Sequence, residues 1–75
     1  MKYEDLIKRV GWGEEFLFKY KGEEYWISQN SDGRYLTKVS DGESQEFKST
    51  KALFDNARIM GKTIEQIWEE IEYLS

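Results

Sequence analysis

Two short segments with period-two hydrophobicity, separated by a glycine turn, constrain the fold of this chain more than any other feature. Residues 15–20 and 23–28 carry apolar side chains at alternate positions, and Gly22 lies in the two-residue gap between them. A two-residue loop there sets Phe18 opposite Tyr25, whereas a slip of one residue would set Phe18 opposite a glutamate. The pattern therefore predicts a β-hairpin together with its register.

Further turn signals extend the hairpin into a four-stranded antiparallel meander. Asn, Asp and Gly residues mark turns at 30–33 and 41–42, with strands expected over 34–39 and 44–47. A four-residue loop at the first turn and a two-residue loop at the second keep apolar side chains opposite one another. The predicted pairs are Phe16 with Ile27, Leu17 with Trp26, Ile27 with Leu36, and Leu36 with Phe47. The face assigned to the core carries Phe16, Phe18, Tyr25, Ile27, Leu36 and Phe47.

Helical spacing of apolar residues precedes and follows the meander. In residues 2–10 the apolar positions recur at i, i+3, i+4 and i+7, and Gly11 stands where such a helix would end. Ser49 can cap a helix over 50–57. A final helix is expected to begin at a capping box that starts at Thr63. Its apolar stripe is Ile64, Ile67, Trp68, Ile71 and Leu74.

The order of these elements predicts an α+β fold in a single domain, residues 1–75. We expect an N-terminal helix, a four-stranded antiparallel β-meander and two C-terminal helices, with the helices packed mainly on one face of the sheet. A chain of 75 residues is close to the lower size at which a domain folds alone, and this one has no cysteine for a disulfide. Its stability therefore depends on packing, to which three Trp, five Tyr and four Phe residues are suited.

The absence of histidine as well as cysteine narrows the chemistry open to the chain. These two side chains are the ones most used for proton transfer near neutral pH, for nucleophilic attack and for binding soft metals. Adjacent glutamate pairs do not replace them, because consecutive residues on a strand or helix point in different directions. We therefore expect no enzyme activity, no catalytic residue, no metal and no cofactor.

Charge and hydropathy restrict the partners and the setting. The net charge of -4 opposes binding to a phosphate backbone, so nucleic acid is disfavoured. It weakly favours a basic protein partner, and the alternative is that it simply keeps a small domain soluble. No segment approaches the roughly 20 apolar residues of a membrane helix, and the N-terminus has no hydrophobic run of the signal-peptide type. The expected setting is the cytoplasm, without a membrane.

The second face of the meander is the first candidate site. It carries Leu17, Trp26, Tyr35 and Val39, and both Trp and Tyr are enriched in protein interfaces. If the helices cover only the core face, these side chains form an exposed patch for self-association or for a protein partner. Alternatively, Trp12 with its flanking loop, or one of the helices, covers them. The leading hypothesis is a small non-enzymatic protein-interaction module.

The acidic final helix suggests a second hypothesis. It carries Glu65, Glu69, Glu70 and Glu72, with no Lys or Arg from position 63 onward. One interpretation is docking to a basic partner as an inhibitor or immunity-type protein, and the other is a solvated helix face. Binding of single-stranded nucleic acid is a third hypothesis, because aromatic side chains on a sheet can stack bases. Five basic against eight acidic residues in 14–48 oppose it.

Four runs of residues resemble small uncharacterised proteins of Gram-positive bacteria and their phages or mobile elements, in the order helix, meander, helix, helix. The runs are Phe18-Lys19-Tyr20-Lys21-Gly22, Tyr25-Trp26-Ile27, Phe47-Lys48-Ser49 and Gly61-Lys62-Thr63-Ile64-Glu65-Gln66-Ile67-Trp68. They are turn, cap and core residues that span most of the chain. The resemblance implies a bacterial or phage cytoplasmic setting and transfers no function, catalytic residue or binding residue.

Overall fold

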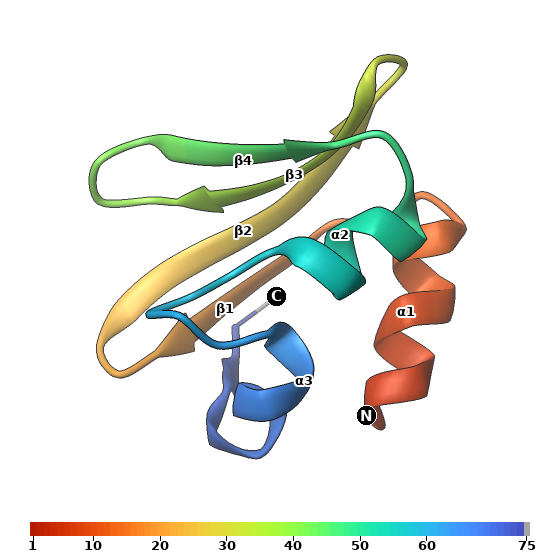
Figure 1. The fold of residues 1–75 in the computed structure, drawn as a ribbon. Helices are drawn as coiled ribbons and strands as arrows, with labels where there is room; N and C mark the ends of the chain where they lie inside the picture. Colours follow the sequence, from red (N-terminus) through yellow and green to blue (C-terminus); the bar gives the residue numbers. More distant parts are fainter. Residues whose placement is uncertain (75) are drawn as a thin grey trace.

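Figure 1 shows the computed structural model of the chain, which describes residues 1–74. In this part of the chain, three α-helices and one 3-10 helix accompany a five-stranded antiparallel sheet. The α+β class is confirmed, whereas the fifth strand was not expected. The elements in chain order are α1 Tyr3–Gly11, β1 Phe16–Tyr20, β2 Glu23–Asn30, β3 Gly33–Lys38, β4 Glu43–Phe47, α2 Thr50–Asn56, α3 Ile64–Ile67, the 3-10 helix η1 Trp68–Glu70, and β5 Glu72–Tyr73.

The predicted hairpin forms the centre of the sheet, whose strand order is β4-β3-β2-β1-β5. Its register is confirmed, with Phe18 paired to Tyr25. Lys21 and Gly22 both have positive φ, 50° and 82°. Two successive residues of this kind make a type I′ turn, whose twist matches that of the two strands it joins. The two-residue loop therefore fixes the hairpin as the sequence indicated.

The connection between β2 and β3 is shorter than predicted, although its register is correct. Ile27 pairs with Leu36 as expected, but Asn30 and Gly33 also pair, so the loop has two residues instead of four. The Asn30 side-chain oxygen accepts hydrogen bonds from the backbone N–H groups of Asp32, at 2.8 Å, and Gly33, at 3.2 Å. These hydrogen bonds form a tight local turn, so the pairing of β2 with β3 extends up to the two-residue loop.

The predicted register between β3 and β4 is wrong by two residues. Leu36 pairs with Gln45 and not with Phe47. The loop is longer than two residues because the backbone N–H of Gly42 donates to the carbonyl oxygen of Lys38, at 2.9 Å, and so closes a wider turn. A shift of two keeps every side chain on its predicted face. Phe47 accordingly still packs, partly buried, against the core.

The C-terminal segment differs most from the prediction. The capping box is confirmed, since the Thr63 hydroxyl accepts from the Gln66 N–H at 3.1 Å and the Gln66 side chain accepts from the Thr63 N–H at 2.8 Å. The expected helical stripe as far as Leu74 is wrong, because α3 ends at Ile67 and the chain passes through η1 into β5. β5 pairs with the edge of β1, where it satisfies backbone groups that a continued helix would have left unpaired.

The helices are short and pack on one another as well as on the sheet. Tyr3 of α1 meets Phe54 of α2 edge-on, with ring centroids 5.8 Å apart and an interplanar angle of 89°. The predicted cap of α2 is confirmed, because the Ser49 hydroxyl accepts from the Ala52 N–H at 3.0 Å. Within residues 1–74, none of the helices combines the length and the apolar character needed to cross a membrane.

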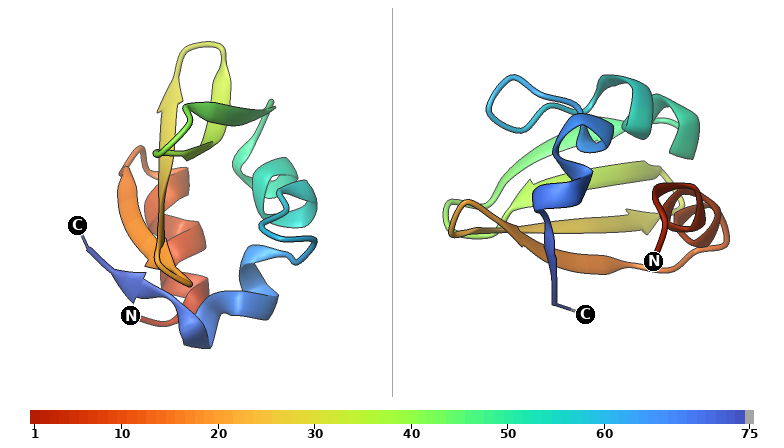
Figure 2. Two further views of the ribbon diagram at one scale, coloured as in Figure 1. Left: turned by 90° about the vertical axis from the view of Figure 1, so that its left-hand side faces the viewer. Right: turned by 90° about the horizontal axis from the view of Figure 1, so that it is seen from below.

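The core lies between the sheet and the helices (Figure 2). All six side chains assigned to it by strand pairing are buried or packed against it, and Tyr20, which is 1% exposed, joins them. Ring burial of this kind compensates for the short chain. The buried side chains are Leu6, Val10, Phe16, Phe18, Tyr20, Tyr25, Ile27, Leu36, Leu53, Phe54, Ala57, Ile59, Ile64 and Ile67.

Candidate functional site

The face of the sheet that points away from the helices carries a row of aligned side chains. Successive residues on a strand point to opposite faces, and the observed register aligns Leu17 with Trp26. Thr37 lies next to Trp26 on one side and next to Ser44 on the other. Leu74 extends the row beyond Leu17, since its backbone N–H donates to the Leu17 carbonyl oxygen at 2.9 Å. At about 4.8 Å per strand, the row is about 19 Å long.

Four apolar side chains on this face form what we call the outer patch: Leu17, Trp26, Val39 and Leu74. Trp26 is 41% exposed, Val39 44% and Leu74 39%, while Leu17 is half-buried. All four lie outside the hydrophobic core. A shallow hollow of about 370 Å³ adjoins three of them, with Glu15 at its edge. The outer patch is therefore an apolar surface open to solvent, a feature found at association surfaces.

The helices leave the outer patch open. In Figure 2 they lie on one side of the sheet, and no helix of the described part of the chain covers the other side. Trp12 does not cover it either, because this side chain is 75% exposed and borders a hollow formed with Met1, Lys8 and Arg9. Of the two alternatives drawn from the sequence, an open face is the one that the structure supports.

Tyr35, the remaining residue predicted on this face, has polar neighbours. Its hydroxyl lies 3.1 Å from Asn30 Oδ1 and 3.3 Å from Glu46 Oε2. Further along the row, Thr37 Oγ1 and Ser44 Oγ are 2.6 Å apart and share a hydrogen bond. The row is thus apolar at Leu74, Leu17 and Trp26 and becomes polar toward β4.

Leu74 is the member of the outer patch that the sequence did not reveal. Its spacing predicts the apolar stripe of a helix, and it reaches this face only because the chain is extended after η1. One signal could have found it. Ile71, Glu72 and Tyr73 alternate in polarity, a pattern that fits a short strand as well as a helix end.

The four glutamates of the predicted final helix do not share one helix face. Glu65 belongs to α3, Glu69 and Glu70 belong to η1, and Glu72 belongs to β5. In β5, Glu72 lies opposite Lys19 and points to the same side of the sheet as the outer patch. The acidic group is therefore divided, with three carboxylates in the helical layer and one beside the patch.

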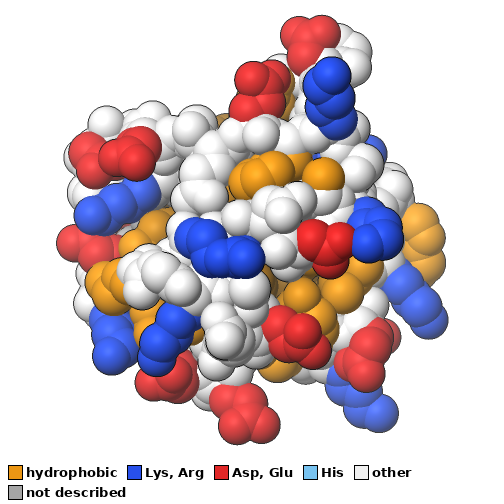
Figure 3. Space-filling model, viewed as in Figure 1, with side chains coloured by type: hydrophobic (Ala, Val, Ile, Leu, Met, Phe, Trp, Pro, Cys, Tyr) orange, Lys and Arg blue, Asp and Glu red, His pale blue; other side chains and the backbone are white. Residues whose placement is uncertain are grey.

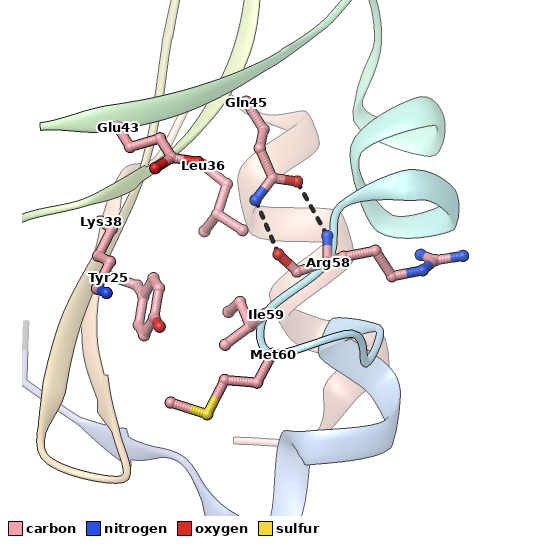
Figure 4. A pocket seen from close by; sticks show the side chains of 8 residues that line it. All are labelled: Tyr25, Leu36, Lys38, Glu43, Gln45, Arg58, Ile59 and Met60. Atoms are coloured by element: carbon pink, nitrogen blue, oxygen red, sulfur yellow. Dashed lines mark hydrogen bonds between the residues drawn. The ribbon is translucent and has the colours of Figure 1, made fainter.

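Another hollow lies between the β3–β4 hairpin and the turn that follows α2 (Figure 4). Its volume of about 200 Å³ is below the roughly 300–1,000 Å³ typical of small-molecule sites. The Gln45 side chain closes one side, where it donates to the Arg58 carbonyl oxygen at 2.8 Å and accepts from the Arg58 N–H at 3.0 Å. The remaining residues that line it are Tyr25, Leu36, Lys38, Glu43, Ile59 and Met60.

The pKa shifts of four side chains move their titration away from neutral pH. Burial raises the pKa of Tyr3 and of Tyr25. Hydrogen bonds to carboxylates raise the pKa of Arg9 and of Lys51. Each of these shifts favours the form that the side chain already has at pH 7, the reverse of what a general base or nucleophile needs. Within residues 1–74, no three carboxylates lie close enough together to hold a metal ion.

The chain matches no protein-family profile, no curated protein and no solved structure. Its function is therefore inferred from the geometry of the outer patch and from the charges around it.

Proposed function

We propose that the protein is a small non-enzymatic interaction module that binds another protein molecule through the outer patch. The supporting observation is that Leu17, Trp26, Val39 and Leu74 form an open apolar surface on a sheet whose helices all pack on the other face. So short a chain has little apolar surface to spare from its core. A tryptophan left outside that core suits an interface, because Trp is among the residues most enriched in binding hot spots.

Site-specific photo-crosslinking tests the proposal. A photoreactive amino acid at Val39 lies in the outer patch, and one at Asn56, exposed at the end of α2, is the matched control. In a lysate of the native host, the probe at position 39 should give discrete adducts that the probe at position 56 does not. Unlabelled wild-type protein should compete for these adducts, and the Trp26→Thr variant should compete less.

The competition experiment needs a folded variant. Trp26→Thr keeps a residue suited to a strand in β2, and a circular dichroism melt verifies its fold. Equal adducts from both probe positions, or full competition by a folded Trp26→Thr variant, would contradict the proposal. An adduct of twice the mass of the chain would identify the partner as a second copy.

The other functions stay predictions. Docking of the acidic C-terminal residues on a basic protein now concerns two surfaces, because Glu72 is separated from the glutamates of α3 and η1. Binding of single-stranded nucleic acid has little electrostatic support, since Lys19 is the one basic residue that points outward from the strands within residues 1–74. The bacterial or phage origin rests on the resemblance alone, and the cytoplasmic setting rests on the resemblance and on the hydropathy of the sequence.

A further inference from the structure

Charged side chains surround the outer patch, and most of them are acidic. The registers place Glu24, Glu46 and Glu72 on the outward face of the sheet, together with a single lysine, Lys19. Glu15 adds a carboxylate at the edge of the hollow. We call Glu15, Glu24, Glu46 and Glu72 the acidic rim. By contrast, Figure 3 shows basic and acidic side chains interspersed over the side that the helices cover.

No carboxylate of the acidic rim takes part in an ion pair within the described chain, and Lys19, directly opposite both Glu24 and Glu72, leaves four carboxylates facing a single ammonium group. The ion pairs of residues 1–74 join Arg9 to Glu14 and Lys51 to Asp55, so none of them involves the rim. Glu46 accepts a hydrogen bond from the neutral hydroxyl of Tyr35, at 3.3 Å. The rim therefore sets a negative potential around an apolar surface, an arrangement that attracts and orients a basic partner.

A partner of ordinary interface size must also contact the rim. A specific complex buries about 800 Å² on each side, which is about a sixth of the 4759 Å² surface of the described chain. Four partly buried apolar side chains cannot supply that area, so the contact extends over neighbouring carboxylates such as Glu24 and Glu72. Burying these without positive partners is strongly unfavourable.

The same charges disfavour a second copy of the chain as the occupant. In a two-fold dimer formed through this face, the surface meets an identical surface. The acidic rim of one copy would then lie against the acidic rim of the other, with one Lys19 from each chain as compensation. Like charges brought together in this way oppose association.

We propose that the outer patch binds a basic segment of another protein, in which an apolar or aromatic side chain lies next to arginine or lysine. This inference rests on the proposed function and specifies its partner. The apolar side chain would cover Trp26 and enter the hollow of about 370 Å³, while the cations would reach Glu24 and Glu72. Arginine fits best, because its guanidinium can stack on an exposed indole ring and pair with a carboxylate at the same time.

Three synthetic peptides of equal length test this inference. In one peptide arginine alternates with leucine, and in the other two serine or glutamate replaces the arginine. Amide chemical shifts of the isotope-labelled protein report both affinity and location. The arginine peptide should bind at the outer patch and weaken as salt is added. The serine peptide should bind about tenfold more weakly, the factor that two or three exposed ion pairs supply.

Paired charge variants provide the control. Glu24→Gln combined with Glu72→Gln should weaken the arginine peptide about three- to tenfold. Glu65→Gln combined with Glu69→Gln makes the same charge change in the helical layer and should weaken it by less than about twofold. Equal losses from the two pairs would overturn the role of the acidic rim. Equal affinity of the serine and arginine peptides would overturn the basic partner and leave the proposed function standing. No shifts at the outer patch with any peptide would count against both.

Discussion

Truncating two leucines to alanine should separate the core from the outer patch by their effects on stability. Leu53 is 0% exposed, so Leu53→Ala loses about 2 kcal/mol of transfer free energy. A cavity left in the core brings the total loss to about 3 to 4 kcal/mol. Leu74 is 39% exposed at an edge of the sheet, where water fills the vacated space. Leu74→Ala should therefore lose about 1 kcal/mol or less.

Urea unfolding followed by tryptophan fluorescence measures both losses of unfolding free energy. The losses of unfolding free energy caused by Leu53→Ala and Leu74→Ala should differ by at least about 2 kcal/mol. This difference corresponds to about 8 to 16 °C in Tm for a domain of this size. An unchanged dependence on urea concentration would show that the two variants unfold like the wild type. A loss at Leu74 as large as the loss at Leu53 would refute the reasoning, because it would mean that Leu74 is buried and the outer patch is covered.

Three further predictions concern the turns, the caps and the tyrosines. Gly33→Ala should lower the free energy of unfolding in urea by about 1 to 3 kcal/mol, since a Cβ there would lie 2.5 Å from a backbone carbonyl oxygen in β4. Gly11→Ala has open space around it and should raise the free energy of unfolding by about 0.5 kcal/mol. A lower free energy of unfolding for Gly11→Ala would contradict this comparison. Thr63→Ala should lose about 1 kcal/mol through the missing cap, and Thr63→Ser should retain most of it. Burial raises the pKa of Tyr3 and Tyr25 above the ordinary 10.0, so their contribution to stability is complete below about pH 10 and is lost as the pH rises through the folded-state pKa. Replacing both by Phe should flatten the alkaline fall of unfolding free energy, and an unchanged fall would contradict this assignment.

The parts of the sheet that the sequence predicts correctly are those that follow from the alternation of side chains between the two faces of a strand, which we call parity. The pairing of Phe18 with Tyr25 follows from a local turn and from the match of apolar side chains, and both are visible in the sequence. The β3–β4 register was missed because the length of that loop depends on the backbone hydrogen bond between Gly42 and Lys38. Parity survives a shift of two residues, so Phe47 was still assigned to the correct face.

The candidate site was predicted only in part, for a physical reason of another kind. Leu17 and Trp26 follow from alternation on their own strands, and Val39 follows from the same alternation continued one residue past β3. Whether helices cover them depends on where α1, α2 and α3 pack, a tertiary property that no local pattern specifies. The spacing of Leu74 and Glu72 predicts a helix. They lie in an extended segment instead, because this segment pairs with the otherwise unpaired edge of β1.

The pairing of β5 with β1 also has a consequence for the order of folding. Phe18 pairs with Tyr73 although about 55 residues separate them, whereas β1 and β2 are joined by a two-residue turn. Closing the long loop loses more chain entropy, so the meander should form first and β5 should dock late. Two-residue strands also fray in the native state, and the amide of Leu74 should exchange with deuterium earlier than the amides of β2. The outer patch would thus be completed in the last step of folding and would be the first part to open.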